Sequence, residues 1–291
     1  MVGSKPIVTD FPRTIIRVFP RRTNATPTDA FSFVGQPPMP LFQPKADEVH
    51  ISVAFTWDLL RAEELSRSWG RFYPVVKLGG PALDDPGADF LPGRYLSEGH
   101  VITSRGCPNH CSWCFVPKRE GGIRELPIVE GWNVLDNNLL ACSDAHVESV
   151  FEMLRQQKPP IEFTGGFEAE RVTPRVIELL RSIRLGQVFL AYDAEGRRGG
   201  AFAAIERLRV AGLGLRQVRC FVLSGRDGDT IGAAEGRCQD VMGQGALPFM
   251  MLYQPADRYI DYARDWRRLQ RKWTRPAAML AKHPTRDVVR T

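Results

Sequence analysis

Apolar runs alternate with amphipathic stretches through most of the chain after residue 98. The short runs, rich in β-branched and aromatic residues, predict strands, and the stretches with apolar residues every three or four positions predict helices. Strands that alternate with helices in this way favour a parallel sheet. The six expected strands span residues 101–104, 133–140, 161–164, 187–192, 217–223 and 247–253.

Helix starts are marked by capping residues in two places. Ser143 precedes an amphipathic stretch, and Thr173 is followed by Pro174, a residue favoured at the first helical position. Two more helices are expected over residues 199–210 and 229–242. A last helix is expected over residues 259–273, with an apolar face formed by Tyr259, Tyr262, Trp266, Leu269 and Trp273.

The first hundred residues follow another pattern. Eight prolines before residue 45 predict an irregular chain over residues 1–48. A strand at 49–55, a helix at 57–72 and a strand at 75–78 then predict one small β-α-β unit with parallel strands.

Composition excludes several classes of protein. No run approaches the roughly 20 apolar residues that cross a bilayer, and the first ten residues lack a signal-peptide core, so we expect a cytoplasmic protein that contacts no membrane. Six cysteines are too few for a disulfide scaffold in a chain of 291 residues, and three of them fall within eight positions. In a reducing compartment such a group indicates a metal site.

Three cysteines, Cys107, Cys111 and Cys114, have the spacing C-x3-C-x2-C directly after the first strand of the alternating region. Three thiolates on one loop can ligate three irons of a [4Fe–4S] cluster and leave the fourth iron open. Structural zinc is the competing metal, but it prefers four protein ligands, and His110 has little room to serve as the fourth. The spacing therefore favours the cluster.

The motif, with the aromatic Trp113 before its last cysteine, resembles that of the radical S-adenosylmethionine (SAM) superfamily. The resemblance covers about residues 98–255 and implies a partial (βα)6 TIM-like barrel in which an open iron binds SAM. Reductive cleavage then yields a 5′-deoxyadenosyl radical that abstracts hydrogen from substrate. It also implies an electron donor such as flavodoxin or ferredoxin. The expected α/β fold has three parts: a proline-rich arm and small α/β unit over 1–97, the barrel over 98–258, and a helix and tail over 259–291.

The resemblance also implies residues that contact SAM. Trp113 is expected near adenine. Either of two runs could receive the amino group: the run Asp136, Asn137 and Asn138 after the second strand, which position favours, or the run containing Gly165, Gly166 and Glu168 after the third. A turn or capping role is open for both runs. Tyr192 and Asp193 end the fourth strand beside the expected ribose, and Ser224 ends the fifth, where the family binds adenine or ribose.

Cys142 follows the expected end of the second strand, where it could face the cavity and donate a hydrogen atom. A lone cysteine is more often a small buried apolar residue, so packing is the competing interpretation. Upstream, the turn Gly79-Gly80-Pro81 is similar to the end of a cobalamin-binding domain. The Asp-x-His-x-x-Gly cobalt-ligand motif is absent, so the resemblance implies a vestigial domain without cobalamin.

Net charge bears on the substrate. The chain carries +6, with 32 Arg against 7 Lys, which fits either an anionic partner or a compositional bias that leaves arginines solvating the surface. Small radical SAM proteins of this kind are similar to those of phage DNA-hypermodification pathways. That resemblance implies an isomerase that rearranges an amino-acid adduct on a thymine base of DNA, in the host cytoplasm. The alternatives are a radical SAM enzyme for a small molecule or peptide, and a non-catalytic iron–sulfur or zinc binding module.

Overall fold

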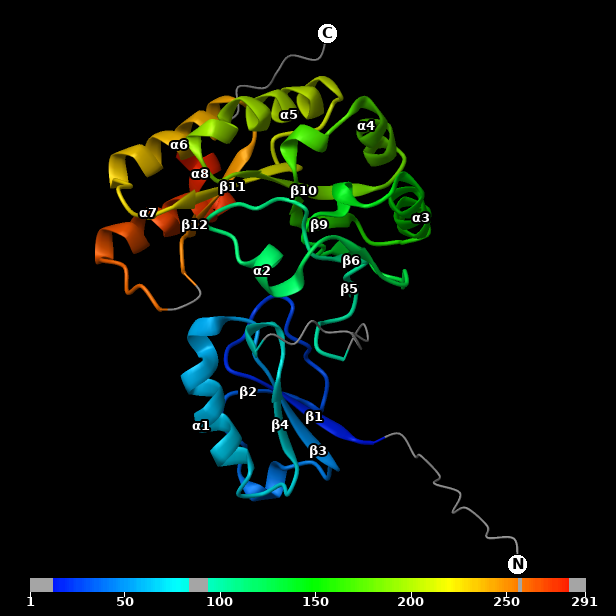
Figure 1. Ribbon diagram of the computed structural model, residues 1–291, viewed down its shortest axis with the longest axis vertical. Coiled ribbons are helices and arrows are strands. Elements are labelled where there is room, and N and C mark those ends of the chain that lie inside the picture. Colours follow the sequence, from blue (N-terminus) through cyan, green and yellow to red (C-terminus); the bar gives the residue numbers. More distant parts are fainter. Residues whose placement is uncertain (1–12, 84–93, 256–257, 283–291) are drawn as a thin grey trace, which may run out of the picture. The chain divides into compact units, whose positions relative to one another are not determined.

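A computed structural model describes residues 13–83, 94–255 and 258–282. The chain forms two compact units, Met1–Glu98 and Gly99–Thr291 (Figure 1). Both contain parallel sheets and α-helices, which confirms the α/β class. Within the described ranges, no helix is long and apolar enough to cross a membrane.

The N-terminal unit is a four-stranded parallel sheet with the order β2-β1-β3-β4. Two of its strands lie in the segment that was expected to be irregular, so that prediction was wrong. The apolar run at residues 15–19 forms a strand before Pro20 interrupts it. The strands are β1 (Ile15–Phe19), β2 (Ser32–Val34), β3 (Glu48–Ser52) and β4 (Val76–Gly79).

The two faces of this sheet differ because side chains alternate along each strand. One face packs against α1 (Leu59–Trp69), whose Leu65 and Trp69 are fully buried against residues such as Val49 and Ile51. The other face carries Glu48, which is almost completely buried.

Glu48 on that polar face is surrounded by cations. Its carboxylate accepts hydrogen bonds from Lys77 Nζ at 2.6 Å and His50 Nε2 at 2.8 Å, and it pairs with Arg13. His50 Nδ1 lies 2.6 Å from the hydroxyl of Tyr95. The bonds from Lys77, His50 and Arg13 lower the pKa of Glu48 from 4.5 to about 2. We call Glu48, Lys77, His50, Arg13 and Tyr95 the Glu48 cluster.

The C-terminal unit is built on a six-stranded parallel sheet with the order β12-β11-β10-β9-β8-β5. Neighbours in the sheet therefore follow one another along the chain, apart from a separate hairpin of β6 (Ser104–Arg105) and β7 (Arg124–Glu125). The six strands are β5 (His100–Val101), β8 (Asn133–Val134), β9 (Ile161–Phe167), β10 (Leu185–Tyr192), β11 (Val218–Ser224) and β12 (Leu247–Leu252).

The first two strands of this sheet are much shorter than expected. β5 and β8 have two residues each, whereas four and eight were expected. The chain after Val134 leaves the ladder because its side chains bond to another segment, as described below.

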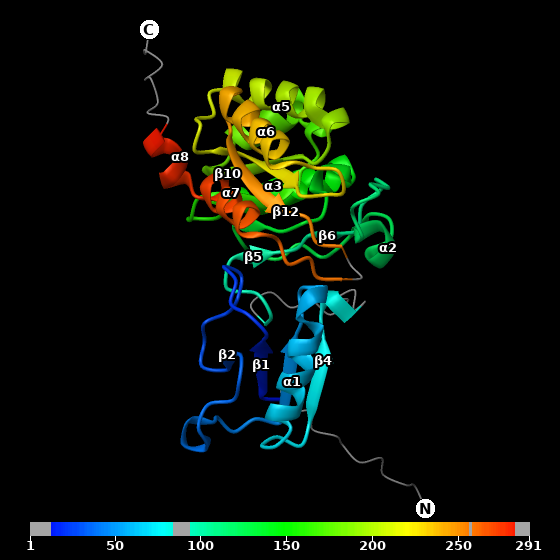
Figure 2. The same ribbon diagram turned by 90° about the vertical axis from the view of Figure 1, so that its left-hand side faces the viewer.

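Four helices lie on one face of the six-stranded sheet (Figures 1 and 2). Ser143 and Thr173 cap two of them through bonds from the backbone N–H groups of His146 and Val176, which confirms both expected starts. Thr230 caps a third. The helices are α3 (Asp144–Arg155), α4 (Pro174–Arg181), α5 (Arg198–Val210) and α6 (Ile231–Gly243).

Alternation along β10 and β11 decides what each face of this sheet carries. One set of side chains joins the core beneath the helices, and it includes Val188, Leu190, Val218, Cys220 and Val222. Phe189, Arg219 and Phe221 occupy the intervening positions and therefore point to the opposite face.

The C-terminal helix begins five residues later than expected. α7 (Arg264–Thr274) is followed by α8 (Pro276–Lys282). Leu269 and Trp273 are buried in the core, as the apolar stripe predicts, but Tyr259 is exposed and Tyr262 precedes the helix. The periodicity was misleading because Tyr262 is engaged elsewhere: its hydroxyl, with one proton to donate, lies 2.8 Å and 2.7 Å from the main-chain carbonyl oxygens of Gly225 and Tyr253.

Candidate functional site

The three clustered cysteines lie on the loop between β6 and α2 (Val116–Glu120). Cys107, Cys111 and Cys114 are free thiols of intermediate exposure. The N–H of Cys114 donates to the carbonyl of Cys111 at 3.0 Å, which closes a turn between the last two. The N–H of Cys107 donates to the carbonyl of Gly121 at 3.2 Å. A main-chain bond therefore anchors the loop at Cys107, and a turn links its last two cysteines.

A glycine is required where this loop begins. Gly106 has φ +84°, and a Cβ there would lie 2.1 Å from the carbonyl oxygen of Gly122. Any other residue would push the cysteine loop away from the β6–β7 hairpin.

The residues Asp136, Asn137 and Asn138 support the cysteine loop, and we call them the brace. Asp136 accepts hydrogen bonds from the Thr103 N–H at 2.6 Å and from the Thr103 and Ser104 hydroxyls at 2.6 and 2.7 Å. Asn137 Oδ1 accepts from the Gly106 N–H at 3.0 Å. Asn138 Nδ2 lies 3.5 Å from Cys107 Sγ. The three side chains thus hold successive points along the same segment.

The brace explains why β8 is short, and it also limits which of its atoms could bind a ligand. Burial raises the pKa of Asp136, although the bonds from Thr103 and Ser104 lower it, and both carboxylate oxygens are occupied. Asn138 differs, because its Oδ1 is buried and accepts no hydrogen bond from any residue that the structure describes. An unsatisfied buried acceptor is costly unless a ligand supplies the donor.

Glu168 meets the brace from the end of β9. Its Oε2 accepts from Asn138 Nδ2 at 2.8 Å and from Arg171 Nε at 2.7 Å. Burial raises the pKa of Glu168, but the bonds from Asn138, Arg171 and Asn109 outweigh burial and hold the pKa below its usual value. The two runs predicted as alternatives for one role are therefore in direct contact.

Close packing explains why positions 165 and 166, shortly before Glu168, are glycines. A Cβ on Gly165 would lie 2.2 Å from the carbonyl oxygen of Asp136, so the glycine allows β9 to approach the brace. Gly166 has φ +91°, and a Cβ there would lie 3.3 Å from the ring of Phe221.

The end of β10 meets the middle of the cysteine loop. Burial raises the pKa of the Cys111 thiol, with a hydrogen bond from Arg197 opposing it and Asp193 adding to it. Burial also raises the pKa of Asp193, while a hydrogen bond from the Trp113 side chain lowers it. The guanidinium carbon of Arg226 stands 4.5 Å from the Trp113 ring centroid. Trp113 thus contacts residues that follow two different strands.

Cys114 also lies close to the other two cysteines. Burial is the first cause of the raised pKa of Cys114, and charge on Cys111 and Cys107 raises it further.

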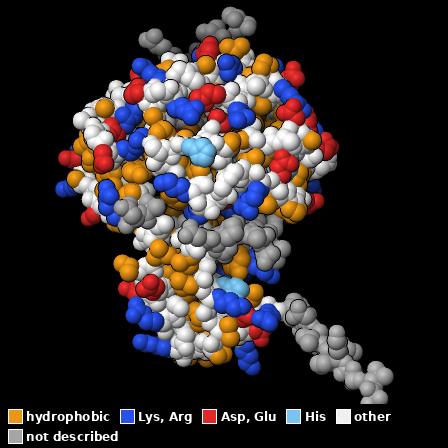
Figure 3. Space-filling model, viewed as in Figure 1, with side chains coloured by type: hydrophobic (Ala, Val, Ile, Leu, Met, Phe, Trp, Pro, Cys, Tyr) orange, Lys and Arg blue, Asp and Glu red, His pale blue; other side chains and the backbone are white. Residues whose placement is uncertain are grey.

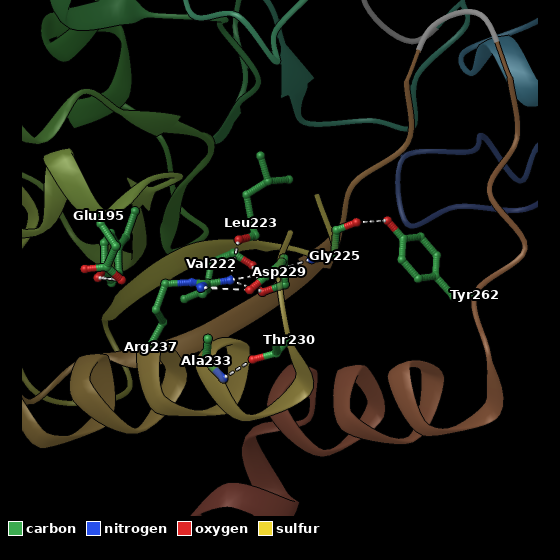
Figure 4. A network of polar contacts seen from close by, with 11 residues as sticks. Glu195, Val222, Leu223, Gly225, Asp229, Thr230, Ala233, Arg237 and Tyr262 are labelled. Atoms are coloured by element: carbon green, nitrogen blue, oxygen red, sulfur yellow. Dashed lines mark hydrogen bonds and ion pairs between the residues drawn. The ribbon is translucent and has the colours of Figure 1, made fainter. Parts of the chain in front are cut away.

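The loop after β11, which carries Arg226, is held by an ion pair (Figure 4). Asp229 Oδ2 accepts from the Gly225 N–H at 2.7 Å and from Arg237 Nη2 at 2.6 Å. Ser224 is fully buried and lies 3.4 Å from Arg237 Nη2. Tyr262 closes the network on Gly225.

Two predicted residues lie apart from this group. The Tyr192 side chain is fully buried in the core beneath the helices, and its hydroxyl donates to Glu195 at 2.9 Å. Burial raises the pKa of Cys142, a hydrogen bond with Ser104 lowers it, and charge on Asp136 and Glu125 raises it. Cys142 also packs against the apolar core. Its neighbours are therefore those of the brace, not the clustered thiols.

The donor set of the cysteine loop fits three ligands of a cluster better than a zinc site. Three soft thiols share one anchored loop, whereas structural zinc needs a fourth protein ligand. Across the described residues, no group of three or more His, Cys, Asp or Glu side chains already has a metal-binding arrangement. The fit therefore rests on the chemistry and placement of the thiols.

Sequence reasoning missed three arginines. Arg197 and Arg226 follow neighbouring strands and contact the cysteine loop. Arg219 lies on the face of β11 opposite the helices. Only Arg219 left a signal, as a charge at an alternate position of an otherwise apolar strand. No protein-family model matches the chain, and a search of curated proteins finds no significant match.

Proposed function

We propose that this protein is a radical SAM enzyme with one [4Fe–4S] cluster held by Cys107, Cys111 and Cys114. The observation that carries the proposal is the anchored loop of three free thiols beside the ends of β8, β9 and β10. A bound cluster would supply one electron, taken from a flavodoxin or ferredoxin, for cleavage of the C–S bond of SAM into methionine and a 5′-deoxyadenosyl radical. The protein's own residues would hold the reactants and exclude water.

The sheet supports the same proposal. Six parallel strands in chain order, with helices on one face, are the arrangement expected of a partial (βα)6 barrel. In parallel α/β folds, reacting groups gather at the carboxyl ends of the strands. Asp193, Glu168 and the brace occupy such ends here.

The contacts suggest a role for each residue beside the loop. Asn138 Oδ1 is an open buried acceptor, and Glu168 lies 2.8 Å from the same side chain, so the pair suits the SAM ammonium group. Trp113 offers an aromatic surface for adenine, and Asp193 offers a carboxylate for the ribose hydroxyls. Asp136 and Asn137 are positioning residues in this proposal, because their oxygens hold the loop.

The decisive test is anaerobic reconstitution with iron and sulfide, followed by addition of SAM and dithionite. We expect about four irons per chain and release of 5′-deoxyadenosine. Cys107→Ser, Cys111→Ser and Cys114→Ser should each lose both, whereas Cys238→Ser, at a buried core cysteine, should keep them. One zinc per chain with no iron uptake would favour the binding-module alternative.

A second measurement addresses the SAM site. Asn138→Ala and Glu168→Ala should each weaken SAM binding by about 1.5–3 kcal/mol, because each removes a partner of a charged ammonium group. Glu178→Ala, at an exposed carboxylate of α4, serves as the matched control and should bind SAM as the wild type does. Wild-type affinity in both site variants would show that the amino group is bound elsewhere.

For the substrate, we propose an amino-acid adduct on a thymine base of DNA, which the enzyme would rearrange, with Cys142 as a candidate hydrogen donor. The support is basic charge on α7, where Arg264, Arg268 and Arg271 are exposed and have no ion-pair partner among the described residues. On the face drawn in Figure 3, Lys and Arg side chains are interspersed with Asp and Glu. The three exposed arginines of α7 are the candidates for phosphate contacts.

DNA affinity across a salt series tests this. Phosphate neutralisation gives a slope of about −0.9 per contact, so Arg268→Glu with Arg271→Glu should make the slope shallower by about two contacts. The charge-matched control is Arg61→Glu with Arg67→Glu on α1. Binding that is absent at low salt, or insensitive to salt, would favour a small-molecule or peptide substrate.

A further inference from the structure

An unpaired arginine is buried on the face of the six-stranded sheet opposite α3–α6. Arg219 is only 5% exposed, yet within the part of the chain that the structure describes its Nε and Nη2 donate to no acceptor. Its guanidinium carbon lies 5.2 Å from the ring centroid of Phe189 and 5.5 Å from that of Phe249. Phe221 stacks on Phe189 at 4.6 Å and meets Phe249 edge-on at 5.6 Å.

The arginine lacks the partners that other buried charges in this protein have. Burial alone lowers the pKa of Arg219, so no carboxylate nearby offsets the cost of the charge. Cation–π attraction to the two aromatic rings offsets part of the free-energy cost of burying the charge. These rings do not accept the N–H groups of Nε and Nη2, which find no acceptor among the described residues.

A structural explanation for this arrangement is weak. An apolar side chain of similar volume, such as Met, would fill the space between the phenylalanines without burying a charge. Residues that cost stability in this way are found where a ligand is bound. A planar fork of N–H donors bordered by rings is suited to an oxyanion carried on a flat or apolar group.

We propose that Arg219, Phe189, Phe221 and Phe249 form a binding site for an oxyanion group, a carboxylate or a phosphate, attached to an apolar or aromatic moiety of the substrate. This proposal rests on the proposed function in one respect only: it takes the ligand of this site to be the substrate of the enzyme. The adduct proposed above would supply a carboxylate from its amino acid and a flat base, whereas a nucleotide would supply a phosphate.

The contacts also connect this site to the cysteine loop. A Cβ at Gly166 would lie 3.3 Å from the Phe221 ring, so that ring packs closely against the backbone of β9 at Gly166. Glu168, two residues further along, bonds to Asn138, which contacts Cys107. Arg219 is the second residue of β11, so a substrate held there would extend along the strands toward the carboxyl ends that carry the proposed SAM residues.

The test uses the full-length protein without its cluster and three matched probes: benzoate, phenyl phosphate and neutral benzamide. We expect at least one anion to bind at least about tenfold more tightly than benzamide, because charge-assisted bonds replace unsatisfied donors. The stronger anion identifies the group that the site accepts.

Three variants complete the test. Arg219→Met should abolish the preference for the anion and leave the unfolding temperature unchanged or higher. Arg219→Lys, which keeps the charge, should retain part of the preference. Arg216→Met, at an exposed arginine three residues earlier, should match wild type in both readouts.

Equal binding of the anions and benzamide by wild type would overturn the proposal, as would an anion preference that survives in Arg219→Met. These results do not depend on 5′-deoxyadenosine release. Failure of this site and failure of the radical SAM assignment can therefore be told apart.

Discussion

The two units of this protein each bury a charge on a sheet face, and they treat it in opposite ways. Glu48 in the N-terminal unit accepts bonds from Lys77 and His50 and pairs with Arg13. Arg219 in the C-terminal unit lies against the rings of Phe189 and Phe249, and its Nε and Nη2 find no acceptor among the described residues. Partners offset the cost of burying a charge, so that breaking such a set destabilises the fold, whereas a charge buried without partners keeps that cost. The difference separates a structural cluster from a candidate site.

Like Glu48, Asp136 is a buried carboxylate whose oxygens accept hydrogen bonds, although it lies beside the candidate site. Its substitution should have the largest effect on stability. Asp136→Ala leaves three buried donors of Thr103 and Ser104 unpaired, so the free energy of unfolding should fall by about 3 kcal/mol or more. Urea denaturation of the cluster-free protein measures it. Asp144→Ala, at an exposed carboxylate, is the control and should change little. A loss below about 1 kcal/mol for Asp136→Ala would contradict the brace.

The Glu48 cluster predicts a dependence on pH. The pKa of Glu48 is lowered in the folded state from 4.5 to about 2, so its contribution is fully present above pH 4.5 and is lost as pH falls toward 2. Glu48→Gln should therefore unfold at a lower temperature than wild type near neutral pH, and the gap should narrow below pH 4.5. The control, Glu63→Gln, lies on an exposed position of α1. A gap that stays constant from pH 7 to pH 2 would mean that the ion pairs do not stabilise the unit.

Much of the fold could be predicted from sequence because its signals are local. Apolar runs located β9 to β12, and Ser143 and Thr173 located two helix starts. The strand at Ile15–Phe19 was hidden because the surrounding prolines dominated the interpretation. Strands β5 and β8 were predicted too long because the bonds that end them join residues about 30 positions apart.

The candidate site was predictable only where residues are close in sequence. The cysteine spacing is visible in eight residues, but contacts such as Arg226 over Trp113 join residues more than a hundred positions apart. The difference between Asp136 and Asn138 was not predictable from sequence either. The fold decides which of their side-chain oxygens already accept hydrogen bonds. Whether the residues named for SAM bind it stays a prediction.

The smallest expected effect concerns Tyr262, which joins the ion pair of Asp229 and Arg237 to the chain before α7 (Figure 4). Tyr262→Phe removes bonds to two carbonyls while keeping the ring, so the free energy of unfolding should fall by about 1 kcal/mol. Tyr259→Phe, at an exposed tyrosine, should have no effect. If the network also positions Arg226, the fluorescence of Trp113 should change in Tyr262→Phe, with Trp113→Phe versions of both proteins giving the background to subtract. Unchanged Trp113 emission together with the loss of stability would mean that the satisfied network supports the fold alone, as the Glu48 cluster does.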